Sequence, residues 1–191
     1  MSFDFKIKIS AKLISGKTIV INPKMQNILK ERGFGESEKN TLILDSFETL
    51  YLLYDGKLEL KKINKNITFD ELIQKYIRKN DDILIRFLLY RDLRTRGYVV
   101  KDGFGFGSDF RVYEHGNFGL KDAKYLIFAF NEGKQQKISN LQTNIEQITK
   151  MGKEPIIAVI ERRGEIIYYK INKMNFLENK PALEMKDFNF N

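Results

Sequence analysis

Two short, almost wholly apolar segments constrain the fold of this chain more than any other feature. Residues 124–130 and 155–160 both have the pattern of strands, and strands with so few polar positions belong in the interior of a sheet. Between them, residues 139–151 carry apolar side chains at helical spacing, and Ser139 with Gln142 forms a capping pair. We therefore expect a mixed sheet with helices packed against it.

The first 80 residues show shorter strand and helix patterns. Residues 4–22 alternate apolar and polar side chains around Ser15-Gly16, as short strands joined by a turn would. Asp45 with Glu48 and Thr68 with Glu71 are capping pairs that begin helices. Further strands are expected at 41–44 and 57–62, and a helix at 23–29.

A domain boundary is expected near residue 80. The chain then has an N-terminal α+β domain (1–80), a C-terminal domain with a mixed sheet flanked by helices (81–172) and a polar tail (173–191), so its fold class is α/β (α+β). The second domain begins with a helix that ends at Arg96, and its strands are expected at 98–101, 109–113, 124–130, 155–160 and 165–171.

Composition excludes several classes of site. The absence of cysteine rules out disulfides and thiolate chemistry, and a single histidine rules out any site that needs two imidazoles. The 33 Lys and Arg outnumber the 25 Asp and Glu, and a net charge of +8 suits a polyanionic partner. No apolar run approaches the roughly 20 residues of a membrane span, and the N-terminus does not resemble a signal peptide, so we expect a cytoplasmic protein without a membrane partner.

Four short patterns carry candidate chemistry. Asp109 followed by Asp122-Ala-Lys124 matches metal-dependent nucleases, in which two carboxylates hold Mg²⁺ and a lysine assists the attacking water. The glycines at 103–107 suit either a phosphate cradle or a tight connection between strands, and the latter is favoured because no helix follows.

His115 is a lone loop histidine. Arginines 86, 91, 94 and 96 lie on one helix that is expected to expose them, either as an RNA footprint or paired with acids such as Asp92.

One longer pattern closely resembles a known family. Residues 90–98 read Tyr-Arg-Asp-Leu-Arg-Thr-Arg-Gly-Tyr, and Gly103-Phe-Gly-Phe-Gly-Ser-Asp-Phe and a strand ending in Tyr113 follow without a gap. This is similar to the signature of archaeal tRNA-splicing (tRNA-intron) endonucleases. The resemblance implies metal-independent RNA cleavage without a cofactor, in which a 2′-hydroxyl attacks the adjacent phosphate to give 2′,3′-cyclic phosphate and 5′-hydroxyl ends.

The resemblance also implies where the catalytic groups should lie. The family's tyrosine corresponds to Tyr113 and its lysine to Lys153, whereas the position of its histidine holds Asp122. An aspartate is ionised at pH 7 and repels a phosphate, so it is a poor general acid. Glu146 stands where catalytic relatives carry an arginine. In an active chain, the general acid would be either His115, reaching into the site, or a protonated Asp122.

These departures favour a structural subunit in a heterotetramer with a catalytic endonuclease subunit, acting on pre-tRNA. An active endonuclease and the metal-dependent nuclease are the alternatives. Strand 165–171, apolar on both faces, is expected to pair with a second unit, and loop 131–137 is too basic to be the family's acidic plug. The residues expected to contact RNA are Arg91, Arg94, Arg96, Lys101 and Arg111.

Overall fold

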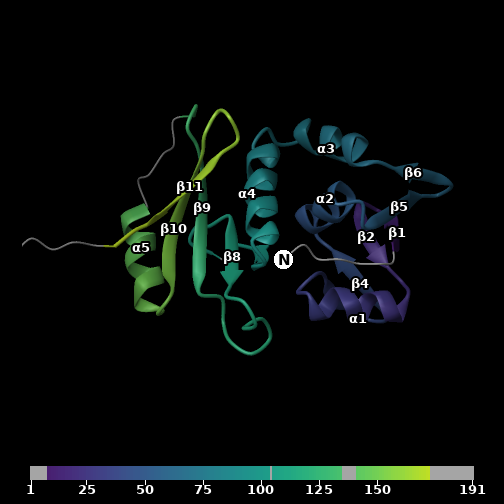
Figure 1. Ribbon diagram of the computed structural model, residues 1–191, viewed down its shortest axis with the longest axis horizontal. Helices are drawn as coiled ribbons and strands as arrows, with labels where there is room; N and C mark the ends of the chain where they lie inside the picture. Colours follow the sequence, from purple (N-terminus) through teal and green to yellow (C-terminus); the bar gives the residue numbers. More distant parts are fainter. Residues whose placement is uncertain (1–7, 104, 135–140, 173–191) are drawn as a thin grey trace, which may run out of the picture.

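The computed structural model describes residues 8–103, 105–134 and 141–172, which form two sheets with helices packed against them (Figure 1). The fold class is α+β, as the sequence predicts. In chain order the elements are β1 (Ile9–Ile14), β2 (Lys17–Val20), α1 (Pro23–Glu31), β3 (Glu36–Glu38), β4 (Thr41–Leu44), α2 (Ser46–Tyr54), β5 (Leu58–Lys62), β6 (Lys65–Ile67), α3 (Phe69–Ile77), α4 (Ile83–Thr95), β7 (Val99–Asp102), β8 (Phe110–Tyr113), β9 (Tyr125–Asn131), α5 (Leu141–Lys150), β10 (Glu154–Ile160) and β11 (Ile166–Lys170).

The N-terminal sheet has the strand order β3-β4-β2-β1-β5-β6. Its first hairpin turns at Ser15 and Gly16, whose φ angles of 50° and 83° are the left-handed values that a tight two-residue turn requires. The capping boxes expected before α2 and α3 are both present. β3 and β6 were not predicted, because each is a three-residue strand at a sheet edge and is too short to show alternation.

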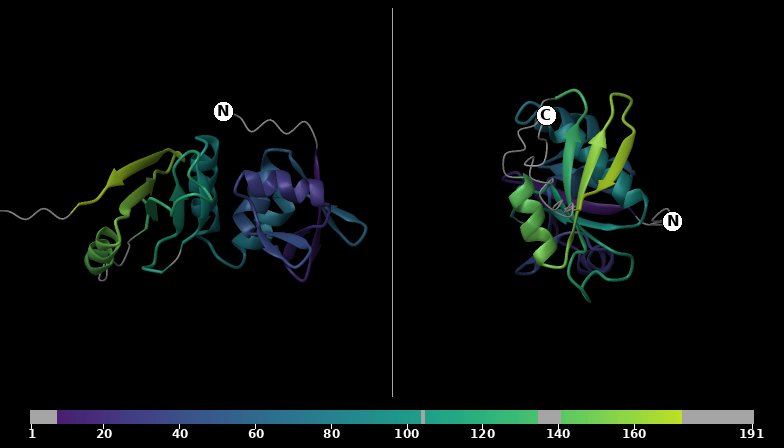
Figure 2. Two further views of the ribbon diagram at one scale, coloured as in Figure 1. Left: turned by 90° about the horizontal axis from the view of Figure 1, so that it is seen from below. Right: turned by 90° about the vertical axis from the view of Figure 1, so that its left-hand side faces the viewer.

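The C-terminal sheet has the order β11-β10-β9-β8-β7, in which only β9 and β10 run parallel. α5 connects those two strands and packs on one face of the sheet, while α4 covers the other face (Figure 2). β9 and β10 are the apolar segments noted in the sequence, and each has a neighbour on both sides. The mixed sheet flanked by helices is therefore confirmed.

The two halves share one hydrophobic core. The Phe47 ring of α2 lies 5.2 Å from that of Phe110 in β8 and 6.0 Å from that of Tyr90 in α4. Because apolar side chains fill the junction, α4 contacts both the N-terminal helices and the C-terminal sheet. The boundary near residue 80 stays a prediction.

Some expectations fall outside the described residues. These include the Ser139 cap of α5 and the tail from residue 173. Among the helices that the structure does describe, none combines the length and the apolar character that crossing a bilayer would take.

Candidate active site at one edge of the C-terminal sheet

Strand register brings the predicted tyrosine and lysine to the same edge of the sheet. Tyr125, the first residue of β9, pairs with Val112 of β8 on one side and with Glu154 of β10 on the other. Tyr113 therefore ends β8 at the edge where Lys153 precedes β10. Asp122 lies on the loop that enters β9 at this edge, so the three positions implied by the family resemblance converge.

Lys153 and Asp122 are neighbours. The Lys153 side chain is mostly buried, its ammonium group donates a hydrogen bond to the Ala123 carbonyl (2.9 Å), and it lies 3.7 Å from a carboxylate oxygen of Asp122. The Asp122 side chain itself is 96% exposed. The cation of this edge therefore lies beside a carboxylate rather than an imidazole.

Tyr113 is held by the loop that follows it. Its ring meets the Phe118 ring edge-on, with the centroids 5.0 Å apart. Val112 is buried against the α4 side, so strand alternation directs Tyr113 to the opposite face. Tyr113 is half-buried at the sheet edge.

His115 lies on the other side of the sheet. Its ring packs on the Tyr98 ring at 4.5 Å, and Tyr98 in turn meets Tyr125 in the core beneath α4. The Nε2 atom lies 2.9 Å from the Arg96 carbonyl oxygen, within hydrogen-bonding distance. This packing also explains Gly97, because a Cβ there would approach Nε2 to 2.9 Å. The structure does not bring His115 to Tyr113 and Lys153.

The metal-nuclease interpretation is wrong on geometry. Asp109 precedes β8 and Asp122 precedes β9, and because these strands are antiparallel the two carboxylates lie at opposite ends of the pair. The Asp109 carboxylate accepts the Ala129 amide at 2.7 Å and lies 2.9 Å from the Arg86 guanidinium. These two contacts tie α4 to the sheet, and burial raises the pKa of the Asp109 carboxyl. No group of three or more carboxylates or imidazoles suited to a metal occurs within the described ranges.

Lys124, the third residue of that pattern, is also engaged. Its ammonium group lies 2.5 Å from Glu114, and this hydrogen bond raises the lysine pKa and lowers that of the glutamate. Glu114 also accepts a hydrogen bond from the Tyr125 hydroxyl at 3.3 Å. These contacts fasten the loop between β8 and β9, which carries Asp122, to the start of β9.

Two of the five residues expected to contact RNA are buried. Arg94 has no exposed surface: it donates to the carbonyls of Arg32 (3.0 Å) and Tyr98 (3.2 Å) and its guanidinium lies 3.8 Å from the Phe34 ring centre. Lys101 donates to the Glu48 carboxylate at 2.7 Å. Because both cations join the C-terminal unit to the N-terminal one, the expectation that they face RNA is wrong.

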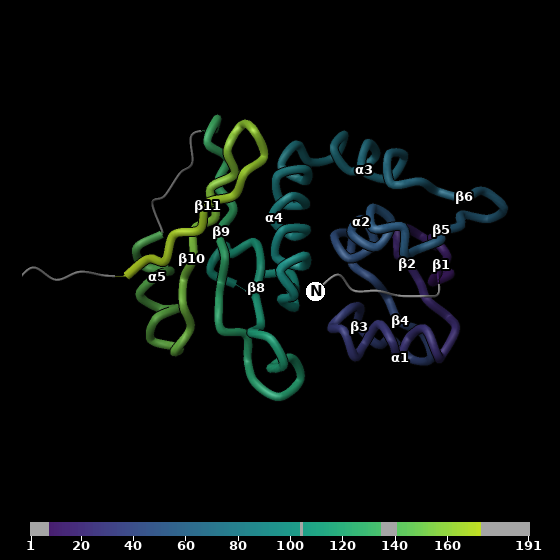
Figure 3. The backbone as a smooth tube through the Cα atoms, viewed as in Figure 1, coloured from purple at the N-terminus to yellow at the C-terminus, as the bar shows by residue number. Residues whose placement is uncertain are grey.

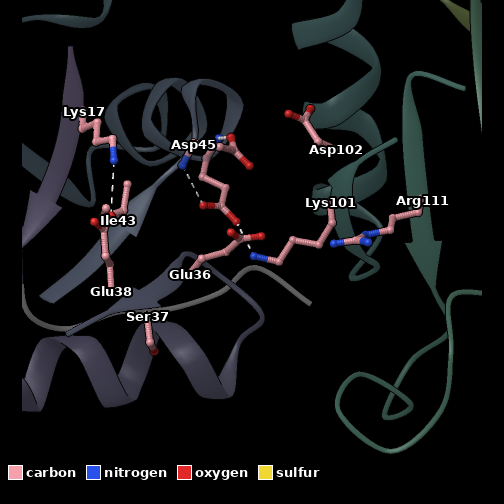
Figure 4. Close-up of a pocket in the computed structure, with 10 residues that line it drawn as sticks. Lys17, Glu36, Ser37, Glu38, Ile43, Asp45, Lys101, Asp102 and Arg111 are labelled. Atoms are coloured by element: carbon pink, nitrogen blue, oxygen red, sulfur yellow. Dashed lines mark hydrogen bonds and ion pairs between the residues drawn. The ribbon is translucent and has the colours of Figure 1, made fainter. Parts of the chain in front are cut away.

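The other three residues expected to contact RNA differ in their exposure to solvent. Arg96 is exposed but pairs with Asp92 at 2.7 Å, and Arg91 is half-buried and lies over the Tyr54 ring. Arg111 is half-buried and lines a cavity of about 390 Å³ between β7 and the N-terminal unit (Figure 4). The other charged side chains of this cavity are Lys17, Glu36, Glu38, Asp45, Glu48, Lys101 and Asp102.

Comparison with known proteins gives the same family for both halves of the chain. Residues 9–73 match the family model of the tRNA intron endonuclease N-terminal domain, and residues 83–168 match that of the catalytic C-terminal domain. A tRNA-splicing endonuclease of Methanococcus vannielii is 35% identical over 167 residues, which cover 87% of this chain and 94% of the relative.

Relatives with the same name occur in other organisms. The tRNA-splicing endonuclease of Methanococcus maripaludis is 34% identical over 87% of this chain and 94% of its own. That of Pyrococcus abyssi is 30% identical over 80% of this chain and 88% of its own. Both domain matches, in the family's order, and these relatives together show that the chain belongs to the tRNA intron endonuclease family.

Proposed function

We propose that this chain is the structural, non-cleaving subunit of a tRNA-splicing endonuclease that excises introns from pre-tRNA at bulge-helix-bulge sites. Its relatives carry that enzyme's name, and they align with most of its length. The observation that carries the non-cleaving role is the exposed Asp122 carboxylate beside Lys153, at the position where the family's histidine is expected.

The expected reaction needs three groups. One helps to remove the proton of the attacking 2′-hydroxyl, one gives a proton to the departing 5′-oxygen, and a cation stabilises the charge that develops on the phosphate. Tyr113 and Lys153 supply the first and the last at the shared sheet edge. The remaining position, where the proton donor is expected, holds the carboxylate of Asp122, and a carboxylate is a poorer general acid than an imidazole.

Asp122 also weakens the attraction of the remaining cation, Lys153, for a phosphate. A carboxylate 3.7 Å from the Lys153 ammonium group offsets the positive charge that would attract the scissile phosphate. It would repel that phosphate directly as well. The edge therefore keeps the shape of an active site while losing both its acid and part of its electrostatic attraction.

An endonuclease active in its own right is the alternative. Tyr113 and Lys153 share the edge, so only the acid has to be replaced. His115 is the candidate substitute, but its ring lies among Tyr98 and Arg96 on the α4 side of the sheet. A working site would require the loop after β8 to turn over, which supports the non-cleaving role.

Assembly with a catalytic subunit is part of the proposal. β11 is an edge strand, and Ile167 and Tyr169 expose 40% and 51% of their surface on its outer face. Exposed backbone groups beside large apolar side chains favour pairing with another strand. A heterotetramer joined through β11 would cover this surface and supply the complete site that this chain lacks.

Restoring the acid tests the proposal. In an Asp122→His variant, Tyr113 and Lys153 should act with the new imidazole, and the purified variant should cut a bulge-helix-bulge RNA to 2′,3′-cyclic phosphate ends. Asp122→Asn is the matched control, because it removes the negative charge without adding an acid. We expect cleavage from the histidine variant alone, and its loss on adding Tyr113→Phe. Equal cleavage by wild type and both variants would contradict the role assigned to Asp122.

A further inference from the structure

A groove with basic walls lies on the N-terminal unit, between α3 and the β5–β6 hairpin. Its volume is about 320 Å³, and its floor is made by the apolar side chains of Leu13, Ile67 and Leu72. We call it the α3 groove and define its charged walls as Lys62, Lys65, Glu71, Lys75 and Arg78. The backbone trace in Figure 3 shows the hairpin projecting from the body of the molecule, beside α3 and far from β9 and β10.

The surplus positive charge of the chain is concentrated here. Residues 57–79 contain seven Lys and Arg against three Asp and Glu, a net charge of +4 out of the total of +8. Two of the acids are already paired, Glu59 with Lys61 at 3.1 Å and Glu71 with Lys65 at 2.6 Å. These pairs leave the positive charges of the other wall residues uncompensated.

Three cations of the α3 groove face solvent without an acidic partner. Lys62, Lys75 and Arg78 are exposed, and among the described residues no carboxylate lies within ion-pairing distance of any of them. Gln74, Lys75 and Arg78 follow Glu71 at helical spacing, so they form one stripe along α3. Lys62 extends from the hairpin on the opposite wall. An extended anion lying in the groove would meet cations on both sides.

The arginines of α4 do not offer such a surface. Arg86 pairs with Asp109, Arg96 pairs with Asp92, and Arg94 is buried. Arg91 is half-buried and lies over the Tyr54 ring. The arginines of α4 are therefore engaged in contacts within the chain, whereas three cations of the α3 groove have no acidic partner among the described residues.

We propose that the α3 groove binds backbone phosphates of the pre-tRNA outside its splice sites. This inference rests on the proposed function, which makes pre-tRNA the substrate of the assembled enzyme. Exposed lysines and arginines that neutralise phosphates bind nucleic acid without sequence preference and release counterions, so their contribution weakens as salt rises. The walls are polar and the apolar floor is small, which suits an RNA backbone better than a packed protein segment. Remote from the candidate site, the groove holds the body of the tRNA while the intron is cut elsewhere.

The test compares two triple variants of the full chain in the assembled endonuclease. Lys62→Gln, Lys75→Gln and Arg78→Gln together neutralise the groove. Lys24→Gln, Lys30→Gln and Lys39→Gln remove the same charge from exposed positions around α1 and β3, on another surface of the N-terminal unit. Each complex is titrated with a complete pre-tRNA transcript and with a short bulge-helix-bulge RNA over a range of salt concentrations.

For the groove variant, the slope of log affinity against log salt for pre-tRNA should become shallower by about 2 to 3, because each phosphate that is no longer neutralised reduces the slope by about 1. Binding of the short RNA should not change, and the control variant should bind both RNAs like wild type. An unchanged slope for pre-tRNA would overturn the proposal, and so would an equal loss on the short RNA. Failure of the groove variant to join its partner subunit would identify a protein interface instead. If the wild-type complex bound neither RNA, the proposed function itself would fail.

Discussion

At the scale of single residues, Arg94 shows how a charged side chain can hold two segments together. It is fully buried, and its guanidinium joins the carbonyls of Arg32 and Tyr98 across the Phe34 ring. A planar guanidinium presents its donors in a rigid fork, whereas a lysine ammonium group is a compact point charge at the end of a flexible stem. Removal of Arg94 would leave both carbonyls without this donor in a buried place.

We expect Arg94→Ala to lower the free energy of unfolding by about 2–4 kcal/mol, because the hydrogen bonds to buried acceptors and the packing of the side chain disappear together. Arg94→Lys should recover only part of this. Arg96→Ala, two positions later at an exposed ion pair, should change stability by less than about 1 kcal/mol. Urea unfolding of the three variants measures these differences. If the Arg94→Ala protein were as stable as wild type but bound RNA more weakly, Arg94 would contact RNA after all.

The sequence predicts the position of a site residue where a family pattern defines it. It does not predict the role of a residue whose hydrogen-bond partners are distant along the chain. Tyr113 lies in the continuous motif, Asp122 and Lys153 follow from the wider family resemblance, and the strand register brings the three positions to one edge. Arg94 and Lys101 belong to the same stretch of sequence, but their acceptors lie 62 and 53 residues away along the chain. Charge patterning cannot distinguish such an internal cation from one that faces RNA, since both appear as an arginine or lysine among apolar neighbours.

At the scale of elements, the helix starts were the most predictable features. Asp45 and Thr68 begin α2 and α3 through capping boxes because the contacts involved span only three residues. Edge strands were the least predictable, since β3 and β6 depend on a neighbouring strand for their hydrogen bonds. A cap is therefore visible in a few adjacent residues, whereas a short edge strand is not.

The cap of α2 has a pH dependence that can be measured. Burial raises the pKa of the Asp45 carboxyl to about 8, and the neighbouring Glu48 adds to this shift. The unfolded chain has an aspartate pKa near ~3.9, so the folded state holds this proton more tightly. The contribution of Asp45 to the free energy of unfolding is therefore greatest below about pH 4 and declines as pH rises to about 8.

Asp45→Asn keeps a good N-cap while removing the titration. Relative to wild type, this variant should gain stability progressively between about pH 4 and pH 8. The measurement is the free energy of unfolding at intervals across that range. A difference that stays constant with pH would show that Asp45 is ionised in the folded protein throughout.

At the scale of the whole molecule, one core and a few charged contacts fix the two units against each other. Phe47, Tyr90 and Phe110 pack across the junction, and the buried Lys101–Glu48 pair also joins the two units. No sequence pattern indicates this junction, because its residues come from separate segments and none of these segments has a distinctive pattern by itself.

β11 differs from the junction in this respect. Its two-sided apolar pattern is visible in the sequence, and the structure leaves its outer face exposed.

Charging the outer face of β11 should separate the proposed assembly. Ile167→Lys together with Tyr169→Lys puts two cations on that face, and we expect light scattering to show a smaller particle for the mixture with the catalytic subunit. Arg163→Gln, in the adjoining exposed turn, is the control and should leave the mass unchanged. An assembly of full mass with the double variant would place the interface elsewhere.

The most direct test of the non-cleaving role is single-turnover cleavage of a bulge-helix-bulge RNA by the purified wild-type chain, with and without its catalytic partner. We expect no cleavage by the chain alone, cleavage by the mixture, and the same rate when this chain carries Tyr113→Phe. Efficient cutting by the wild-type chain alone to 2′,3′-cyclic phosphate and 5′-hydroxyl ends would contradict the account.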